Sequence, residues 1–282
     1  MYFFTFCNYI NRISTNDLED ALYMLLSSMK KFIPKYELIC FINYNLNFER
    51  FKDFNVKFAK YYNDNSLSIY NKNTGSGLWL NMSFNKLNIY KDLYYNTNKD
   101  YIWVDLDTII YSDLSYMDQY DNVFIENGGY SSKDSCIFEN DKNYTLPYNQ
   151  YIQGNFWKIN INTYNKLINI FEDIKENKLI LKYDCQTLFS YYVYFKNDNI
   201  PKDVFILGRN IKSNTINGLS IWDISGENHP NIEGLNNLYI SDSNTLKSKL
   251  YPNKDIHILS FTFITLRILS KTNKFIELFK YN

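Results

Sequence analysis

The sequence predicts an α/β protein with a mostly parallel central sheet flanked by helices. Short apolar runs rich in β-branched and aromatic residues occur at 3–7, 37–42 and 101–110, as is typical of buried strands. Longer amphipathic segments at 17–32 and 78–93 lie between these runs. Such alternation of strands and helices favours parallel strands joined by right-handed crossovers.

The N-terminal elements follow from the spacing of apolar residues and from end signals. Segment 17–32 carries its apolar residues at a helical period, with Thr15 or Asn16 as the expected cap and Pro34 after its end. Residues 54–61 alternate as expected for a further strand.

The pattern is weaker after residue 113. It indicates strands at 122–126, 151–159 and 255–259 and helices at 161–176, 184–195 and 262–281. No internal repeat or linker interrupts the chain, so we expect one main domain over residues 1–260.

Charge and composition exclude several classes of protein. The 282 residues hold 30 basic and 30 acidic side chains, and this zero net charge gives no reason to expect a nucleic-acid partner. No apolar run approaches the roughly 20 residues of a membrane-spanning helix, and the N-terminus lacks the basic region of a signal peptide. Cys7 and Cys40 fall in expected strands and are predicted to be small core residues. We therefore expect a cytoplasmic location.

The most informative stretch is YIWVDLDTII, at residues 101–110, in which Asp105 and Asp107 follow an apolar run. Carboxylates are almost never fully buried unless they are paired or bind metal, and open α/β sheets bind ligands at the carboxyl ends of strands. Because alternate residues of a strand share a face, the two carboxylates are expected to converge. They predict a site for Mn²⁺ or Mg²⁺ bridging a phosphorylated substrate. The alternative is a solvated turn whose aspartates cap the next segment.

This stretch and several others resemble the GT-A-fold nucleotide-sugar glycosyltransferases, particularly the glycogenin and bacterial lipopolysaccharide galactosyltransferase family. The resemblance covers most of the chain, with one strong match at residues 101–113 and several weak ones. The weak matches are Thr5-Phe6-Cys7-Asn8, Ser83-Phe84-Asn85-Lys86-Leu87, Gln153-Gly154-Asn155, Tyr183-Asp184-Cys185-Gln186 and His257. The resemblance implies a GT-A (Rossmann-like) fold with a smaller acceptor-side subregion.

The resemblance implies three metal ligands, namely Asp105, Asp107 and His257, with Asp105 also touching the ribose. His229 is the rival to His257. Lys86 would stabilise donor oxygens or hold Asp105 in place as a point charge.

The resemblance also implies residues that bind the nucleotide sugar and the acceptor. The residues Phe6, Cys7 and Asn8 would hold the nucleoside base at the end of the first strand. Gly154 would lie beside the donor sugar. The candidate catalytic residues are Asn155, Asp184 and Gln186, which would frame the donor sugar and the acceptor hydroxyl.

The activity implied is transfer of a hexose from a UDP-sugar to a glycan or lipid-linked saccharide acceptor, as in lipopolysaccharide or capsule biosynthesis. Residues 1–115 would form the nucleotide-binding half and 116–260 the acceptor half. The basic amphipathic helix expected at 261–282 is either an ordinary packed helix with solvated lysines or a segment in peripheral contact with the inner face of a membrane. The segment after His257 lacks the Lys-Pro-Trp of that family, and the stereochemical outcome stays open.

Other functions are compatible with the same residues. The segment Val104-Asp105-Leu106-Asp107-Thr108 also fits a haloacid-dehalogenase-type phosphatase, in which Asp105 would be the nucleophile. A nucleotidyltransferase with a related sheet is a second alternative. A degenerate transferase fold that only binds a sugar nucleotide or a glycan is a third.

Overall fold

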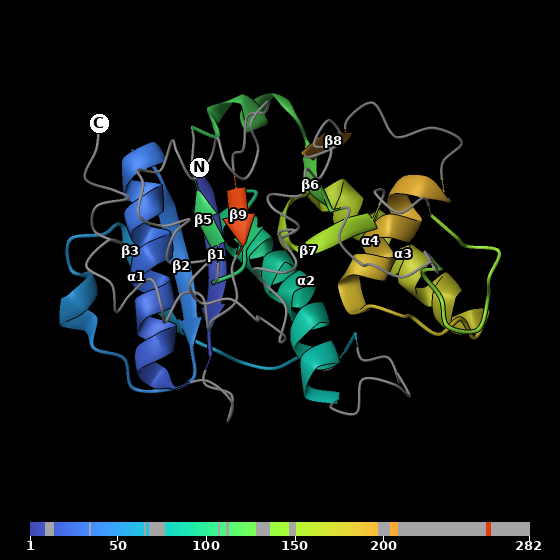
Figure 1. Ribbon diagram of the computed structural model, residues 1–282, viewed down its shortest axis with the longest axis horizontal. Coiled ribbons are helices and arrows are strands. Elements are labelled where there is room, and N and C mark those ends of the chain that lie inside the picture. Colours follow the sequence, from blue (N-terminus) through green and yellow to red (C-terminus); the bar gives the residue numbers. More distant parts are fainter. Residues whose placement is uncertain are drawn as a thin grey trace, which may run out of the picture.

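The computed structural model describes residues 1–8, 14–33, 35–64, 66–67, 77–106, 108–110, 113–127, 136–146, 151–196, 204–207 and 258–260. It has an α/β architecture, which confirms the predicted class (Figure 1). Helices α3 and α4 lie together at one end of the molecule, and α1 lies at the other. The predicted C-terminal helix at 261–282 lies outside the described residues.

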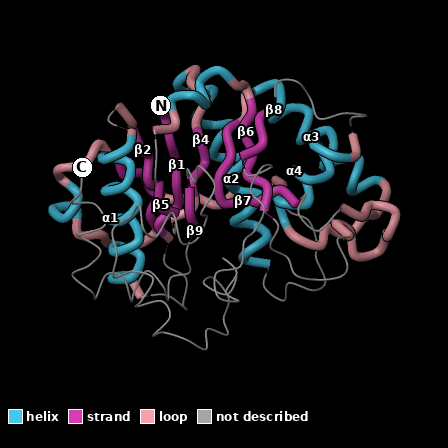
Figure 2. Tube along the Cα trace, turned by 45° about the horizontal axis from the view of Figure 1, so that its top comes forward, coloured by secondary structure: helices cyan, strands magenta, loops and turns pink. Residues whose placement is uncertain are grey.

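A seven-stranded sheet forms the central layer (Figure 2). Its strands, in spatial order, are β3 (Val56–Lys60), β2 (Glu37–Ile42), β1 (Tyr2–Cys7), β4 (Ile102–Val104), β7 (Tyr151–Lys158), β6 (Asn122–Asn127) and β8 (Val204–Leu207). Strand β7 runs antiparallel to both of its neighbours, β4 and β6. The sheet is therefore mixed, and not as uniformly parallel as the alternation of elements suggested, because an apolar run carries no information on strand direction.

A second, two-stranded sheet pairs β5 (Thr108–Ile110) with β9 (Ile258–Ser260) in antiparallel register. The run at 101–110, expected to be one strand, is thus two strands in two sheets, with Leu106 in a turn between them. Asp105 follows the end of β4 and is not inside a regular strand. The argument that alternation brings Asp105 and Asp107 to one face consequently does not apply.

Helix α1 (Thr15–Phe32) packs on one face of the sheet through buried leucines such as Leu18, Leu22 and Leu25. Its N-cap is Ser14, and not Thr15 or Asn16 as predicted: Ser14 Oγ accepts from the Asp17 amide at 3.2 Å. Ser14, Thr15 and Asn16 can all cap a helix, and the spacing of the apolar residues alone does not show which of them does so.

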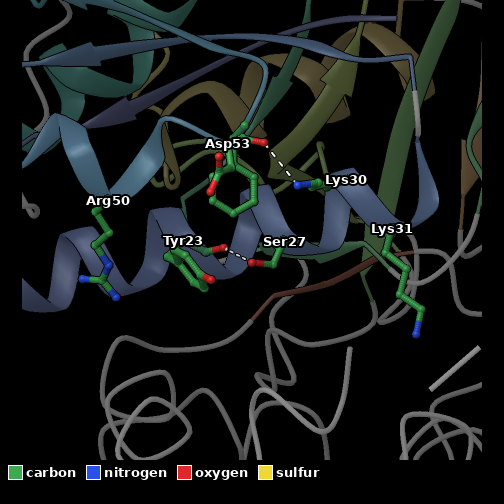
Figure 3. Close-up of a pocket in the computed structure, with 7 residues that line it drawn as sticks. Tyr23, Ser27, Lys30, Lys31, Arg50 and Asp53 are labelled. Carbon is green, nitrogen blue, oxygen red and sulfur yellow. Dashed lines mark hydrogen bonds between the residues drawn. The ribbon is translucent and has the colours of Figure 1, made fainter. Parts of the chain in front are cut away.

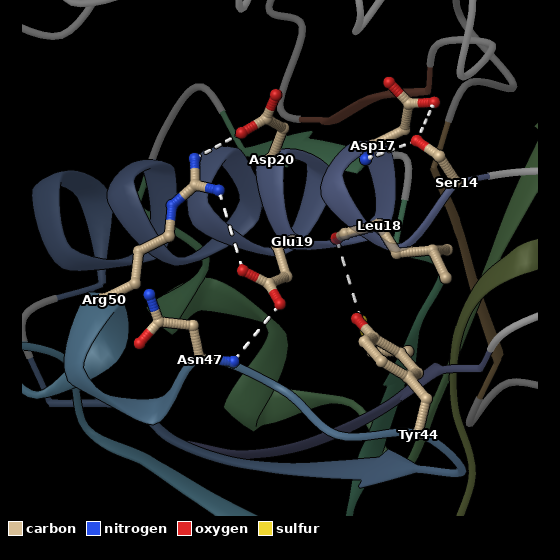
Figure 4. Close-up of polar contacts among 9 residues, drawn as sticks. Ser14, Asp17, Leu18, Glu19, Asp20, Tyr44, Asn47 and Arg50 are labelled. Atoms are coloured by element: carbon tan, nitrogen blue, oxygen red, sulfur yellow. Dashed lines mark hydrogen bonds and ion pairs between the residues drawn. The ribbon is translucent and has the colours of Figure 1, made fainter.

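Acidic side chains on α1 anchor the segment that contains the short 3₁₀ helix η1 (Phe48–Phe51), as Figure 4 shows. Arg50 pairs with Asp20 and lies 4.0 Å from Glu19. The Asn47 amide donates to Glu19 Oε1 at 3.2 Å. These contacts hold the connection between β2 and β3 against α1.

Helices α2 (Gly77–Thr97), α3 (Ile161–Glu176) and α4 (Asp184–Tyr194) contribute to the core on the opposite face. Side chains of the central strands alternate between the two layers. Cys7 and Val104 belong to the α1 side, whereas Phe4, Phe6 and Trp103 belong to the side of α2. Cys7 and Cys40 are buried core residues, as predicted.

No helix in the described part of the chain is both long and apolar enough to cross a lipid bilayer. The large sheet takes strands from both expected halves, since β1 to β4 precede residue 115 and β6, β7 and β8 follow it. The expected boundaries at residues 115 and 260 stay predictions.

Candidate functional site

The strand order has a switch point between β1 and β4. From β1 the chain continues toward β2 and β3 on one side, while the strands beyond β4 lie on the other. Ligands of open α/β sheets bind at such a point, outside the carboxyl ends of the strands. Asn8 follows β1 and Asp105 follows β4, and the register Phe4↔Trp103 places both at the same edge.

Asp105 is held at this edge by its backbone and by one carboxylate oxygen. Its amide donates to Asn155 O at 2.7 Å, which extends the pairing of β4 with β7 by one residue. Oδ1 accepts from Trp103 Nε1 at 2.8 Å and from Lys86 Nζ at 2.9 Å. Oδ2 accepts no hydrogen bond from any residue that the structure describes, and the side chain is 31% exposed. One oxygen is therefore fixed and the other is available.

Lys86 reaches the site from α2, and its side chain is only 13% exposed. Besides Asp105, its Nζ donates to Gly154 O at 3.3 Å and lies 4.4 Å from the centre of the Trp103 ring. Burial by itself lowers the pKa of Lys86, but the charge of Asp105 leads the opposing effects and the net pKa is raised. The ammonium group therefore stays charged throughout the physiological range.

Ser83 lies one helical turn before Lys86 and joins α2 to the start of α4. Its Oγ donates to Asp184 Oδ2 at 2.8 Å, while Asp184 Oδ1 accepts from the Gln186 amide at 3.2 Å. Residues three apart lie on the same side of a helix. One side of α2 thus contacts both the end of β4 and the first turn of α4.

Gly154 allows α4 to approach β7 closely. A Cβ at this position would lie 3.0 Å from Cys185 Sγ and 3.1 Å from Gln186 Cγ, closer than side chains ordinarily pack. Cys185 itself is fully buried, and burial raises the pKa of its thiol well above its usual range. Its role here is packing, because a protonated thiol is a poor nucleophile.

The structure brings six of the predicted site residues into one region: Lys86, Asp105, Gly154, Asn155, Asp184 and Gln186. Phe6 lies close to them, because its ring centre is 4.7 Å from that of Trp103. These residues come from five separate elements or their ends.

Cys7 does not present its side chain to this region. Its Sγ lies 3.2 Å from Tyr44 OH and 3.7 Å from Leu18 O, on the α1 side of the sheet. A side chain one residue from Phe6 on a strand must face the opposite layer. Only the backbone of Cys7 remains available to a ligand on the Asp105 side, and a contact of Cys7 with the nucleoside base stays a prediction.

Several described side chains have buried polar atoms without a hydrogen-bond partner among the described residues, and three of them, Asn8, Gln153 and Gln186, lie after β1 or beside Gly154. Asn8 is 5% exposed, and both of its amide atoms are unpaired. Gln153 Nε2 and Gln186 Oε1 are also unpaired. Buried polar groups are normally paired, since leaving them unpaired costs about 1–3 kcal/mol each. Unpaired groups after β1 and beside Gly154 are consistent with a ligand-binding region.

Asp107, His257 and His229 lie outside the described residues. The strands that follow Asp107 and His257 in the sequence, β5 and β9, pair with each other. No group of three His, Cys, Asp or Glu side chains able to hold a metal occurs within the described part of the chain, and His257 as third ligand stays a prediction.

The indole of Trp103 and the hydroxyl of Ser83 were not singled out as site residues by the sequence. The sequence did contain a signal for Trp103, because it lies two residues before Asp105 at the end of a strand. Side chains two apart on a strand share a face. Nothing local predicted Ser83, whose partner Asp184 is 101 positions away.

A pocket of about 430 Å³ lies elsewhere, on the outer side of α1 (Figure 3). Its lining includes Tyr23, Lys30, Arg50 and Asp53. Lys30 Nζ donates to Asp53 O at 3.2 Å, and Arg50 is paired with acidic residues of α1. The α1 layer covers the sheet face opposite to Lys86, so this pocket is separate from the Asp105 region.

Neither a scan against models of protein families nor a search of curated proteins found a match to this chain. The chemistry of the region must therefore be judged from its residues. A partly exposed carboxylate oxygen at a strand end is a suitable ligand for Mg²⁺ or Mn²⁺, which prefer oxygen donors. Asp105 Oδ2 fits such a cation as a ligand, because Oδ1 already accepts hydrogen bonds from Trp103 and Lys86.

Proposed function

We propose that this chain is a metal-dependent glycosyltransferase with a GT-A fold, which transfers a hexose from a UDP-sugar to a cell-surface glycan or glycolipid precursor. The observation that carries the proposal is Asp105, a carboxylate at the switch point of an α/β sheet with one oxygen fixed and one free. The resemblance of residues 101–113 to the glycogenin and galactosyltransferase family supports it.

Asp105 would hold the divalent cation together with Asp107 and His257, the ligands expected from the resemblance. A cation at the diphosphate would stabilise the negative charge that builds up as UDP leaves. Lys86 supports this role because its ammonium group donates to Asp105 Oδ1 and holds the carboxylate in place. Phe6 and Asn8, at the end of β1, would contact the nucleoside base.

The residues beside Gly154 would frame the sugar and the acceptor. Asn155 accepts from the Asp105 amide, so its position is tied directly to the proposed cation site. Asp184 and Gln186 open α4, close to Gly154. Hydrogen bonds from such side chains orient sugar hydroxyl groups and the acceptor, which contributes to rate through positioning.

The test is incubation of the full chain with a panel of sugar nucleotides and Mn²⁺, with release of UDP as the measurement. Wild-type protein should hydrolyse one UDP-sugar slowly, and Asp105→Asn should lower that rate at least a hundredfold while far-ultraviolet circular dichroism shows that the fold is kept. Asp173→Asn is the control, because Asp173 is a half-exposed residue of α3 paired with Lys196, and it should keep full activity.

Three results would contradict the proposal. If Asp105→Asn still hydrolyses the UDP-sugar at the wild-type rate, Asp105 does not take part in the reaction. Release of phosphate from a simple ester, lost in Asp105→Asn, would favour the phosphatase in which Asp105 is the nucleophile. Calorimetric binding of UDP and Mn²⁺ without hydrolysis or transfer of any donor would indicate a binding module.

We further propose that the acceptor is reached at a membrane surface through the basic segment at 261–282, which lies outside the described residues. Its Arg267, Lys271, Lys274 and Lys280 would interact with anionic lipids. Co-sedimentation with anionic vesicles should be stronger for the full chain than for a chain ending at residue 260. Equal binding of both would exclude this role.

A further inference from the structure

Trp103 is a closely packed side chain beside Asp105. It is 2% exposed, and its ring lies edge-on to Phe4 at 5.0 Å and to Phe6 at 4.7 Å. On its other side it stacks on Trp157 at 6.4 Å, with 24° between the ring planes. Packing from β1 and β7 therefore leaves the indole no room to change rotamer.

The indole N–H and the Lys86 ammonium converge on the same oxygen. Trp103 Nε1 donates to Asp105 Oδ1 at 2.8 Å, and Lys86 Nζ donates to it at 2.9 Å. The two donors come from β4 and α2, so they approach Oδ1 from different elements. An indole N–H can only donate, and Asp105 Oδ1 is its acceptor.

We propose that Trp103 is a positioning residue for divalent-cation binding, which fixes the Asp105 carboxylate so that Oδ2 alone meets the cation. The inference rests on the proposed function, because it needs a cation at Asp105. Without the indole N–H, only the flexible Lys86 side chain would hold Oδ1, and the carboxylate could turn. Loss of a hydrogen bond that orients a metal ligand typically weakens metal binding by about 10–100-fold.

Trp157 provides a matched control within the same aromatic cluster. It is 0% exposed and stacks directly on Trp103, but its Nε1 has no hydrogen-bond partner among the described residues. Replacing either tryptophan by phenylalanine removes a similar volume from the same core. Only the change at Trp103 removes a hydrogen bond to Asp105.

The experiment measures Mn²⁺ binding to the full chain in the presence of UDP, from the electron paramagnetic resonance signal of free Mn²⁺. We expect Trp103→Phe to raise the dissociation constant about tenfold or more. Trp157→Phe should leave it within about twofold, because its N–H makes no contact with Asp105. Asp105→Asn should abolish the site.

Equal effects of Trp103→Phe and Trp157→Phe would overturn the inference and leave the proposed function standing. Wild-type protein that binds no more Mn²⁺ than Asp105→Asn would overturn both. If Trp103→Phe does not fold, the hydrogen bond is tested instead by nuclear magnetic resonance. The indole N–H resonances of ¹⁵N-labelled wild-type protein are then compared with those of Asp105→Asn. One indole resonance should move when Asp105 is changed, and spectra without such a shift would refute the hydrogen bond.

Discussion

Lys86 shows how much a single side chain contributes to the candidate site. It is charged, nearly buried and bonded at once to Asp105 and to the backbone of β7. Because its pKa is raised in the folded protein, its contribution to the free energy of unfolding is fully present below its ordinary pKa of 10.5 and is lost as the pH rises through the folded value. Lys86 thus stays charged near neutral pH.

We predict that Lys86→Met lowers the free energy of unfolding by about 2 kcal/mol, because Asp105 would keep a partly buried charge with one neutral donor. Urea denaturation at neutral pH measures the change. Lys91→Met is the control on the same helix, since Lys91 is 34% exposed and lies 3.6 Å from Asp92, and it should cost less than about 0.5 kcal/mol.

Adding Asp105→Asn to Lys86→Met should restore part of the lost stability, because no unpaired charge would then remain. Additive losses in the double variant would mean that the two groups do not interact in solution.

At the scale of elements, the contact between β7 and α4 depends on the absence of a side chain at position 154. The Cys185 sulfur and the Gln186 side chain occupy the space in which a Cβ would lie. Both belong to the first turn of α4, which also carries Asp184. The close approach of these two elements therefore sets the position of the proposed acceptor-side residues.

Gly154→Ala should move the start of α4 and lower the free energy of unfolding by about 1–2 kcal/mol, as expected for overpacking. The rate of UDP-sugar hydrolysis should fall as well. The double variant Gly154→Ala with Cys185→Ala should be more stable than the sum of the two single changes, since removing the sulfur makes room. Chemical denaturation of all three variants tests this, and strict additivity would show that the close contact is absent.

At the scale of the whole molecule, tyrosine burial sets the behaviour of the protein at alkaline pH. The chain has 27 tyrosines, and burial is the leading cause of a raised pKa at seven described ones. These are Tyr36, Tyr44, Tyr61, Tyr62, Tyr90, Tyr164 and Tyr191. For Tyr164, the pKa is raised from 10.0 to about 12.

A pKa that is raised in the folded state means that the unfolded chain loses its tyrosine protons first. The corresponding stability is fully present below pH 10.0, where the unfolded tyrosines begin to ionise, and falls as the pH rises toward about 12. We predict a cooperative loss of structure in this interval, with tyrosinate absorbance and far-ultraviolet circular dichroism changing together. Gradual tyrosinate formation well before any loss of circular dichroism would contradict it.

Elements with a clear period could be predicted from the sequence. The helix expected at 161–176 has the same bounds as α3, Ile161–Glu176, and the strand expected at 37–42 is β2, Glu37–Ile42. The direction of a strand and the sheet to which it belongs could not be predicted from the sequence, because both depend on pairing with residues far away in the chain. Thus β7 is antiparallel, and β5 pairs with residues that follow it by about 150 positions.

The candidate site was predictable to a similar extent. The position of Asp105 after a core strand followed from local pattern, and the contact of Lys86 with it is present. Two features were not foreseen from the pattern. The strand ends at Val104, before the aspartates, and the Cys7 side chain faces the α1 layer. The first depends on where the backbone leaves the sheet, which the residue types do not specify. The second follows from the alternation of side chains along β1, but only once Phe6 is known to face the α2 layer.

The pairing of β5 with β9 has a consequence for how the chain can be shortened. A chain cut before residue 258 would leave Thr108–Ile110 as an uncovered strand edge, with its amide and carbonyl groups ready to recruit a strand from a neighbouring molecule. Removing the residues from 258 onward would thus invite self-association a few residues downstream of Asp105, so truncated preparations should be checked for aggregates before any loss of catalysis is ascribed to the missing segment.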